Sequence, residues 1–579
     1  MLRREFLGSM AAGTAALSLA GCATATNGRT TYQPISAARE AELIEAAHFG
    51  RKQPASGRDG LAVSTHPLVS QVAVDVLKEG GNAVDAICAA SMAQTVLEPH
   101  MTTLTGVFSL QYYDAKTGKV TYLNASNNAP LNFPLTLEQL GKESTAILAD
   151  GRGVTVPGFW AGVEAAMGKY GSISMQRCLA PAIDYARNGF ANHSFLWGEI
   201  FVSLDKIGRS EQGREIYFNN GAVQRPGDVL YQKRAADLIE RLAEEGSDYF
   251  YRGGFAENFS REVQGAGGWI TPEDFAAYEV MWQEPVYSSY RGYDIAAAPD
   301  PDFGGVVFAE IMNMAELLDI QTLGPAWASD ETAFRLLQII GRVGTDNILQ
   351  AFAGATPDMA ARVSKELAEQ RFAKLGDDKP ANYIEEVMKL GAGDAVPYPG
   401  SNHLTVTDAA GNVATVLHSC MSLPWSNGLF VDGISICAAG AHFGSGLPAP
   451  GARINARIGP HMFLKNGKCV LAGGSPSVSL QENMTQNAIN LLDFGMSIEE
   501  AVHKPRFGGS SMAKPGAMIM EADMPAPMIA RLEKAGGKAD IVNPWNWMNG
   551  SYDSIYTDPV TGVAHACGDP RRTAMAIAV

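Results

Sequence analysis

The sequence predicts a layered α+β fold, in which stacked antiparallel sheets are flanked by helices. Two observations carry this prediction. First, four segments have the pattern of a β-hairpin, with short alternating apolar runs on either side of a polar, glycine-containing turn. Second, one segment is apolar on nearly every side, which is typical of a helix buried in a large protein. Antiparallel hairpins beside buried helices favour sheets that pack face to face under helical layers.

The hairpins share a common organisation but no fixed sequence period. Each consists of a short strand, a polar turn and a second short strand. Their residue ranges are 106–123, 403–417, 462–472 and 554–566. A further short strand is predicted over 61–64. The chain of 579 residues, 46% of them hydrophobic, is long enough for a large core.

Helical periodicity is clearest in two adjacent segments. Pro67 opens the first helix, whose apolar positions recur at helical spacing until Gly80-Gly81. Asn82 is a favourable N-cap for the second helix, over 83–97, which is rich in Ala, Val, Ile and Met. The region from about 175 to 400 is predicted to be mostly helical. Further helices are expected over 37–49, 235–245, 305–318, 331–352, 359–374, 480–494 and 498–503.

Composition and motifs exclude several classes of protein. The net charge is −16 and Lys and Arg form no run beyond isolated pairs, which argues against nucleic-acid binding and against a basic membrane surface. Neither a GxGxxG turn before a helix nor a GK[ST] motif occurs, and the cysteines show no zinc spacing, so we expect no cofactor and no metal. Buried free thiols are the expected state of six cysteines, although a disulfide is possible after export: Cys88, Cys178, Cys420, Cys437, Cys469 and Cys567.

The first 22 residues have the pattern of a targeting segment. Arg3-Arg4 begins a twin-arginine pattern, and the apolar stretch over 10–20 is too short to span a bilayer. Cys22 ends a stretch that resembles a bacterial lipobox, so we expect lipidation there; the alternative is a plain cleaved signal. The prediction is a signal over 1–22, a tether and helix over 23–59, and a periplasmic protein attached to the membrane only through a lipid on Cys22.

Ser401 stands at the start of a predicted strand. Gly400 precedes it, and Leu404 and Val406 alternate with polar residues after it. A serine is a poor nucleophile without a base. If the chain were cut between Gly400 and Ser401, the new α-amine would be a base within reach of its own hydroxyl. Local sequence alone also allows an ordinary loop serine, so both interpretations stay open at this point.

Short blocks in a fixed order over residues 60–579 identify a family. They include Ser64-Thr65-His66-Pro67-Leu68, Gly80 to Ala86, Glu98-Pro99-His100, Tyr113 to Lys119, Val156-Pro157-Gly158, Gly268 to Asp274, Glu284-Pro285, Gly304-Gly305, Gly474-Ser475-Pro476 and Gly568 to Arg571. The ordered set resembles the γ-glutamyltranspeptidase family of N-terminal-nucleophile hydrolases. The resemblance implies a four-layer αββα sandwich with a largely helical middle. It also implies a precursor that cuts itself into a large-subunit region, 60–400, and a small-subunit region, 401–579.

The same resemblance assigns the reacting groups. Ser401 falls on the position of the family's nucleophilic threonine, and Ser419 falls about where a second threonine supports it. The glycine pair of the oxyanion hole falls on Ser477 and Val478. The implied reaction is attack on a small-molecule amide to give an acyl-enzyme, which water or an amine then resolves. His403 and His418 are weaker candidates for polar groups of the site, and packing is the competing explanation for both.

Several substrate-binding positions depart from the family. The arginine that holds the glutamyl α-carboxylate is replaced by Ser126, and the next residue, a glutamate in the family, is Asn127. A serine pair that also binds this carboxylate falls on Ala456-Arg457, and the acidic pair that holds the α-amine is missing from 434–437. The coordinated loss predicts an acyl group other than γ-glutamyl. Arg457 is either a new anion receptor or a structural ion-pair partner.

The departures leave four hypotheses. The leading one is an exported, autoprocessed amidase or acyltransferase with Ser401 as nucleophile. The others are a pseudoenzyme that binds without turnover, a lyase or isomerase on the same scaffold, and a γ-glutamyl hydrolase with altered contacts. Four aromatic residues would line an apolar pocket or pack in the core: Trp425, Phe443, Trp545 and Trp547.

Overall fold

The structure is a computed structural model, which describes residues 32–352, 358–376, 400–514 and 516–579. Arg3-Arg4, Cys22, the signal over 1–22 and the start of the tether lie outside the described residues. After them, α1 (Ala37–Ala46) begins at Ser36, whose hydroxyl accepts the N–H of Arg39. In the described residues no helix is long and apolar enough to cross a bilayer.

In one antiparallel sheet, here called the β12 sheet, the strand that begins at the predicted cut is one of the inner strands. In the described chain it has seven strands. Strands from before and after residue 400 are neighbours in it, so the two predicted subunit regions form one continuous sheet. In order across the sheet they are β23 (Met575–Ala578), β2 (Gly60–Ser64), β12 (Ser401–Asp408), β13 (Val413–Ser419), β3 (Val107–Asp114), β4 (Lys119–Ala125) and β9 (Met281–Gln283).

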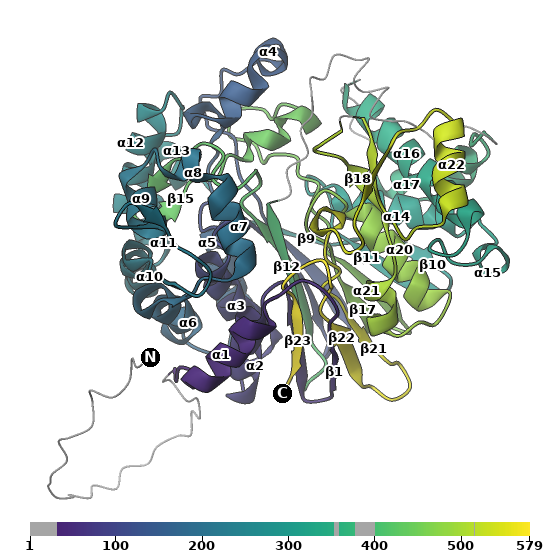
Figure 1. Cartoon of the computed structure of the whole chain (residues 1–579), viewed down its shortest axis with the longest axis horizontal. Helices are drawn as coiled ribbons and strands as arrows, with labels where there is room; N and C mark the ends of the chain where they lie inside the picture. Colours follow the sequence, from purple (N-terminus) through teal and green to yellow (C-terminus); the bar gives the residue numbers. More distant parts are fainter. Residues whose placement is uncertain (1–31, 353–357, 377–399, 515) are drawn as a thin grey trace, which may run out of the picture.

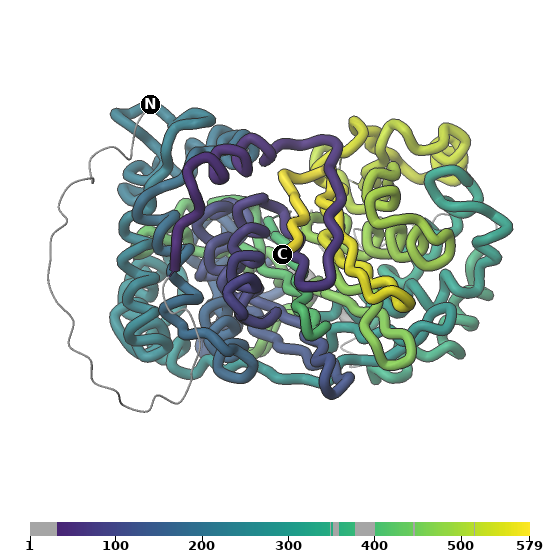
Figure 2. Tube along the Cα trace, turned by 90° about the horizontal axis from the view of Figure 1, so that it is seen from below, coloured from purple at the N-terminus to yellow at the C-terminus, as the bar shows by residue number. Residues whose placement is uncertain are grey.

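The second sheet, here called the β17 sheet, also has seven antiparallel strands in the described chain. Two of them, β10 and β11, come from the region predicted to be mostly helical, so that prediction missed a hairpin. In order the strands are β1 (Pro54–Gly57), β22 (Ala564–Cys567), β21 (Ile555–Thr557), β17 (Lys468–Gly473), β16 (His461–Lys465), β11 (Tyr293–Ala297) and β10 (Val286–Tyr290). Figure 2 shows the N-terminal segment running beside the C-terminal strand, where β2 pairs with β23.

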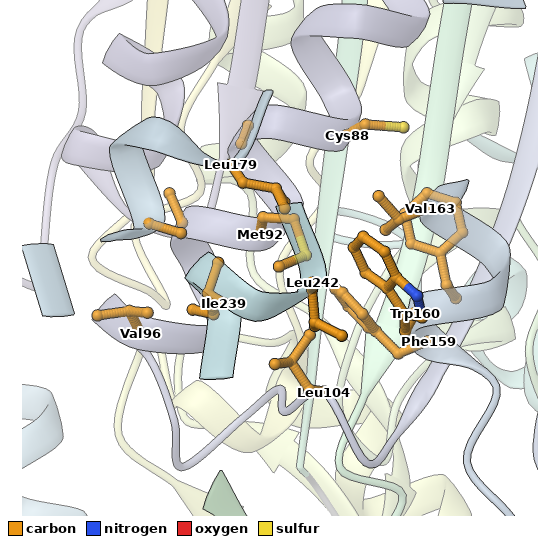
Figure 3. Packing of buried hydrophobic residues seen from close by; sticks show 14 of the residues in the cluster. Cys88, Met92, Val96, Leu104, Phe159, Trp160, Val163, Leu179, Ile239 and Leu242 are labelled. Carbon is orange, nitrogen blue, oxygen red and sulfur yellow. The ribbon is translucent and has the colours of Figure 1, made fainter. Parts of the chain in front are cut away.

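Helices cover the outer face of the β12 sheet (Figure 1). The central one is α3 (Ala83–Leu97), which is buried along its whole length because its residues are small or apolar on every side. Figure 3 shows its Cys88, Met92 and Val96 facing residues of three other helices. The helices of this layer are α2 (Pro67–Lys78), α3, α5 (Phe159–Tyr170), α6 (Met175–Asn188) and α10 (Lys233–Glu245).

A second helical layer covers the β17 sheet (Figure 1). It includes α14 (Gly304–Ala315), α16 (Asp330–Phe352), α20 (Gln481–Leu492), α21 (Ile498–His503) and α22 (Ala526–Lys534). Between the sheets, apolar residues of β3 and β13 pack on residues of β11, β16 and β17. The result is the predicted four-layer αββα fold.

Most predicted elements lie where the sequence placed them. The helix over 83–97 has the predicted bounds because Asn82 caps it, accepting the N–H groups of Val84 and Asp85. The helix predicted over 359–374 is wrong as one element. It divides into α17 (Met359–Arg362) and α18 (Lys365–Phe372), because the Ser364 hydroxyl accepts the N–H of Leu367 and starts a new helix.

Candidate active site

Ser401 is the first residue of β12, and its side chain is half-buried. It pairs in register with Ser419, the last residue of β13. Because side chains of directly opposed residues lie on the same face of a sheet, the two hydroxyls meet, with their oxygens 2.9 Å apart. The hairpin thus positions the Ser419 hydroxyl against the Ser401 hydroxyl, next to the predicted cut between Gly400 and Ser401.

Ser419 connects this pair to the carbonyl of Gly400. Its hydroxyl donates to the Gly400 carbonyl oxygen and accepts the backbone N–H of Met421, at 2.7 Å. A hydroxyl has one proton to donate, so Ser401 is the donor in the bond between the two hydroxyls. A donor on the Gly400 carbonyl polarises it, and the Ser401 oxygen lies beside the same bond. This arrangement can support attack of Ser401 on the carbonyl that precedes it.

The surroundings of Gly400 leave no space for a side chain. A Cβ atom there would lie 2.1 Å from the carbonyl oxygen of Ser422 and 2.5 Å from the Cys420 sulfur. The latter contact involves a buried thiol that also approaches the Gly400 carbonyl oxygen, at 3.6 Å. Close packing therefore fixes the backbone on the N-terminal side of Ser401, which holds the carbonyl in place.

His403 lies on the same face of the β12 sheet as Ser401, and His418, which belongs to β13, lies on the opposite face. His403 Nδ1 is 3.2 Å from the Asp553 carbonyl oxygen, and burial lowers the pKa of His403 to about 3. His418 Nε2 is 2.7 Å from Gln94 Oε1, and burial lowers its pKa to about 3 as well. Among the described residues, neither ring hydrogen-bonds to Ser401. Both histidines are neutral in the ordinary pH range, and neither is placed to act as a base for the Ser401 hydroxyl.

The segment of Ser477 and Val478 follows β17. Gly474 brings this segment close to β12, because a Cβ there would lie 2.4 Å from His403 Nε2. Ser477 has φ +84°, in the left-handed region that a family glycine would occupy without strain. Within the described residues, the N–H groups of Ser477 and Val478 donate to no other group. Two free backbone donors at a turn are what an oxyanion hole requires.

Ser126 is bound to a buried carboxylate. Its hydroxyl donates to Asp302 Oδ1 at 2.8 Å, while the hydroxyls of Ser109 and Tyr122 donate to Oδ2, each at 2.7 Å. Burial raises the pKa of Asp302, and these three hydrogen bonds oppose the rise. The neighbouring Asn127 is fully buried, and its side-chain nitrogen lies 3.4 Å from the Thr105 carbonyl oxygen. The structure thus places Ser126 in a packed polar network around Asp302, whereas the side-chain nitrogen of Asn127 contacts a backbone carbonyl and its side-chain oxygen has no partner among the described residues.

Arg457 pairs with a buried glutamate. Its Nη2 lies 3.1 and 3.2 Å from the two carboxylate oxygens of Glu482, which is 1% exposed. The guanidinium also contacts Gln481 and, at 3.4 Å, the Val478 carbonyl oxygen. This set of contacts ties the start of α20 to the turn at 477–478, which is the ion-pair alternative that the sequence left open.

The four aromatic candidates have different neighbours. Trp425 packs on Tyr217, and Phe443 is fully buried against Phe133. Trp545 packs on His503. Trp547 is connected to the residue of the nucleophile through Arg572, whose guanidinium lies 5.5 Å from the centre of the Trp547 ring and donates to the Ser401 carbonyl oxygen.

Sequence reasoning missed a buried polar cluster behind Ser401. Asn402 Oδ1 accepts the Thr65 hydroxyl at 2.9 Å, and the same hydroxyl contacts Glu98 at 2.7 Å. Arg572 Nη2 donates to the Ser401 carbonyl oxygen at 3.5 Å. Thr65 and Glu98 fall inside two of the sequence blocks that identify the family, so that signal was present. Arg572 directly follows a third block and had no signal of its own.

The described residues contain no group of three or more His, Cys, Asp or Glu side chains placed to hold a metal ion. The six cysteines of the described chain are buried and have free thiols.

Comparisons with known proteins identify the family of this chain. The sequence model of the family named gamma-glutamyltranspeptidase matches residues 69–579. The chain belongs to this family. It is 28% identical over 570 residues to the glutathione hydrolase proenzyme of Bacillus subtilis (strain 168), covering 93% of this chain and 95% of that protein. The γ-glutamyltranspeptidase-family chain is thus an enzyme of the amide hydrolase and transferase type.

Two further relatives extend the comparison to acylases. The acylase ACY 1 proenzyme of Pseudomonas sp. (strain SE83) is 28% identical over 514 residues, covering 84% of this chain and 88% of that protein. The crystal structure of a cephalosporin acylase from Bacillus halodurans superposes with a TM-score of 0.79 at 23% identity, covering 96% of this chain and 99% of that one. This likeness shows the N-terminal-nucleophile hydrolase fold.

Proposed function

We propose that this chain is an exported precursor that cuts itself between Gly400 and Ser401 and then acts as an amidase or acyltransferase with Ser401 as nucleophile. The observation that carries the proposal is the chain of hydroxyls at the start of β12. Ser401 donates to Ser419, and Ser419 donates to the Gly400 carbonyl. The proenzyme names of the relatives support processing in this family.

The cut proceeds by an acyl shift. The Ser401 hydroxyl oxygen attacks the Gly400 carbonyl carbon, and the Ser419 hydroxyl stabilises the negative charge that develops on the carbonyl oxygen. The C–N bond breaks, the proton of the hydroxyl moves to the nitrogen, and an ester joins Gly400 to the Ser401 oxygen. Water hydrolyses the ester. The products are a Gly400 carboxylate and a Ser401 residue with a free α-amine and a free hydroxyl.

Turnover uses the new α-amine as base. The amine takes the proton of the Ser401 hydroxyl as its oxygen attacks the substrate amide carbon. The N–H groups of Ser477 and Val478 hold the oxyanion, and the amine leaving group departs with the proton. The acyl ester on Ser401 then passes to water or to an acceptor amine, which restores the hydroxyl.

The substrate is an amide whose acyl group is not γ-glutamyl. The position of the family's carboxylate-binding arginine holds Ser126, whose hydroxyl is bound to Asp302. Segment 434–437 is Ile-Ser-Ile-Cys, which offers no carboxylate for an α-amine. A charged ligand needs opposite charge when it leaves water. An acyl group without the α-amino acid head fits these residues better.

A denaturing gel with N-terminal sequencing tests the proposal. We expect two bands from the purified protein, the smaller beginning Ser-Asn-His-Leu. Ser401→Ala removes the attacking oxygen and should give one intact band, whereas Ser401→Thr keeps a hydroxyl and should still be cut. A single intact band from the unaltered protein would refute autoprocessing. A cut protein that hydrolyses no amide would identify a pseudoenzyme, and a preference for γ-glutamyl amides would refute the assignment of substrate.

Export is tested separately. The twin-arginine pattern and Cys22 predict a periplasmic lipoprotein. We expect Cys22→Ala to move the processed protein from the membrane fraction to the soluble periplasmic fraction. An unchanged distribution would contradict lipidation at Cys22.

A further inference from the structure

Helix α7 (Ser194–Val202) has an apolar outer side that faces solvent in the described chain (Figure 1). Phe201 is 54% exposed and Val202 is 69% exposed. The ring of Phe201 stacks on the half-buried ring of Trp197, with their centres 5.5 Å apart. These three side chains are here called the α7 patch. A helix on a protein surface ordinarily carries polar residues on its outer side, so a partner is expected to cover this patch.

The inner side of α7 belongs to the fold. Glu199 is the single charged residue of the helix. Burial raises its pKa, and the positive charge of Arg572 opposes the rise, so the carboxyl group lies on the inner side. Phe195 packs there on Trp547, with the ring centres 5.9 Å apart. The helix thus lies close to the residues behind the Ser401 strand and presents its apolar side outward.

The N-terminal segment enters the fold beside α7. The hydroxyl of Tyr32, the first described residue, donates to Asp184 of α6 at 3.2 Å. The short strand β5 (Phe190–Ala191) is all that separates α6 from α7 in the order of elements. Phe49, which follows α1 and is exposed, packs edge-on against Phe195 of α7, with the ring centres 5.3 Å apart. Figure 1 shows α1 and α7 in the same half of the molecule.

A lipid on Cys22 would hold a bilayer on this side of the molecule. Cys22 lies ten residues before Tyr32. An extended residue spans at most about 3.6 Å, so the tether reaches no further than about 36 Å from Tyr32. A short tether of this kind gives an effective concentration in the millimolar range. A small apolar surface is then sufficient for a second contact, because the anchor has already brought the protein to the bilayer.

The composition of the α7 patch fits a lipid surface better than a second protein chain. Trp and Phe are preferred at the boundary between headgroups and acyl chains. A stable protein interface takes about 20–30 residues from each partner, far more than the three side chains of the patch. Segment 194–209 has two acidic and two basic residues, so attraction to charged lipids contributes little.

We propose that the α7 patch inserts into the surface of the bilayer to which the Cys22 lipid is attached. The proposal rests on the lipid anchor proposed above and adds a second membrane contact to it. Two contacts fix the orientation of the protein, which a flexible tether alone does not. Since the inner side of α7 packs on Trp547, the site of Ser401 is then held near the membrane surface.

Co-sedimentation with phosphatidylcholine vesicles tests the proposal. The chain 23–579 has neither the signal nor the lipid, so any binding comes from the folded protein. At millimolar lipid we expect binding that is equal at low and high salt, because the patch has no charge. Phe201→Ser combined with Val202→Ser should weaken the partition coefficient by about 10- to 100-fold and leave the melting temperature unchanged. Absence of binding, or equal binding by this double variant, would overturn the proposal.

The control is Leu137→Ser combined with Val560→Ser. Leu137, on α4 (Leu137–Leu148), is 60% exposed, and Val560, in the turn between β21 and β22, is 92% exposed. This pair exposes as much apolar surface as the two residues of α7, but away from that helix. We expect it to bind vesicles like the unaltered protein. Equal losses in both double variants would show that binding follows total surface hydrophobicity, which would overturn a specific role of α7.

Tryptophan quenching tests the orientation. Phosphatidylcholine with brominated acyl chains quenches tryptophans that reach the acyl region of the bilayer. We expect Trp197→Phe to bind vesicles and to lose most of the quenching, because Phe retains an apolar ring at the surface. Undiminished quenching in this variant would place another tryptophan at the bilayer and would contradict insertion of α7.

The anchor and the α7 patch can fail separately. If Cys22→Ala stays in the membrane fraction and the addition of Phe201→Ser and Val202→Ser releases it, the patch alone retains the protein and lipidation is refuted. If Cys22→Ala is released but the chain 23–579 binds no vesicles, the anchor stands and the patch is refuted. A dimer in sedimentation velocity that the α7 double variant loses, without vesicle binding, would assign the patch to a second copy of the chain.

Discussion

Two polar regions of this molecule differ in how their charged groups are used. Around Ser126 and Arg457, each charge is held by protein: Asp302 accepts three hydroxyls, and Glu482 pairs with Arg457. At the start of β12, by contrast, Arg572 keeps two nitrogens without partners among the described residues. The first region includes Ser126 and Arg457, which the family resemblance of the sequence had suggested as substrate-binding positions.

The difference distinguishes polar groups that stabilise the fold from polar groups that are available to a ligand. A polar group whose hydrogen bonds are complete contributes to the fold, and a ligand would have to break those bonds to use it. A buried donor without a partner favours a ligand that completes it. We therefore expect changes at the start of β12 to alter processing and turnover, and changes around Asp302 and Glu482 to alter stability.

Removal of the Ser419 hydroxyl should have the largest effect. In Ser419→Ala the Gly400 carbonyl loses its donor and Ser401 loses its acceptor. We expect the cut to slow by about 10²- to 10³-fold, the effect typical of one lost oxyanion donor. A time course of the precursor band on a denaturing gel measures the rate.

Ser422→Ala is the matched control for Ser419→Ala. Ser422 is a buried serine near the same carbonyl, but its hydroxyl oxygen lies 3.1 Å from the carbonyl oxygens of both Cys420 and Leu423, either of which can accept its proton. We expect this variant to be cut at close to the normal rate. Rapid cutting of Ser419→Ala would contradict the proposed mechanism, which depends on the hydrogen bonds from Ser401 to Ser419 and from Ser419 to the Gly400 carbonyl.

Asp302→Ala should destabilise the protein without changing its chemistry. The substitution leaves three buried hydroxyls, those of Ser109, Tyr122 and Ser126, without their acceptor. We expect the free energy of unfolding to fall by about 3 kcal/mol, since each unsatisfied buried group costs about 1 kcal/mol or more. Urea unfolding followed by tryptophan fluorescence measures the change. A normal unfolding midpoint with a loss of amide hydrolysis would instead assign Asp302 to the substrate site.

The sequence predicted the hydroxyl pair better than the binding groups. The hairpin turn at 408–412 fixes the register of β12 and β13, so Ser401 must face Ser419 once the turn is identified. Local signals also placed α3, through its Asn82 cap. Strands β10 and β11 were not predicted because they are short and lie within a helical region. The contact of Arg572 with the Ser401 carbonyl oxygen was not predicted because the two residues are 171 positions apart in the sequence. A contact between such distant residues leaves no periodic pattern.

Arg457→Met should produce a smaller loss of stability. It leaves Glu482, which is 1% exposed, without its partner cation. A broken buried pair costs about 3–5 kcal/mol, but Arg457 is itself 31% exposed, so we expect about 2 kcal/mol. The double variant with Glu482→Gln should recover part of the loss, as a double-mutant cycle in urea would show. A loss of amide hydrolysis without a loss of stability in Arg457→Met would instead make Arg457 an anion receptor of the substrate site.

His403 on β12 and His418 on β13 should contribute alike to the pH dependence of stability. Burial lowers the pKa values of His403 and His418 to about 3, below the value near 6.5 of an unfolded histidine. The unfolded chain therefore binds more protons than the folded one between these values. Their stabilising contribution is complete above about pH 6.5 and is lost as the pH falls toward 3. Each histidine should add about 1.4 kcal/mol per pH unit to the slope of the unfolding free energy. His403→Gln should reduce the slope measured by urea unfolding between pH 6 and pH 4, and an unchanged slope would show that His403 is protonated in the folded protein.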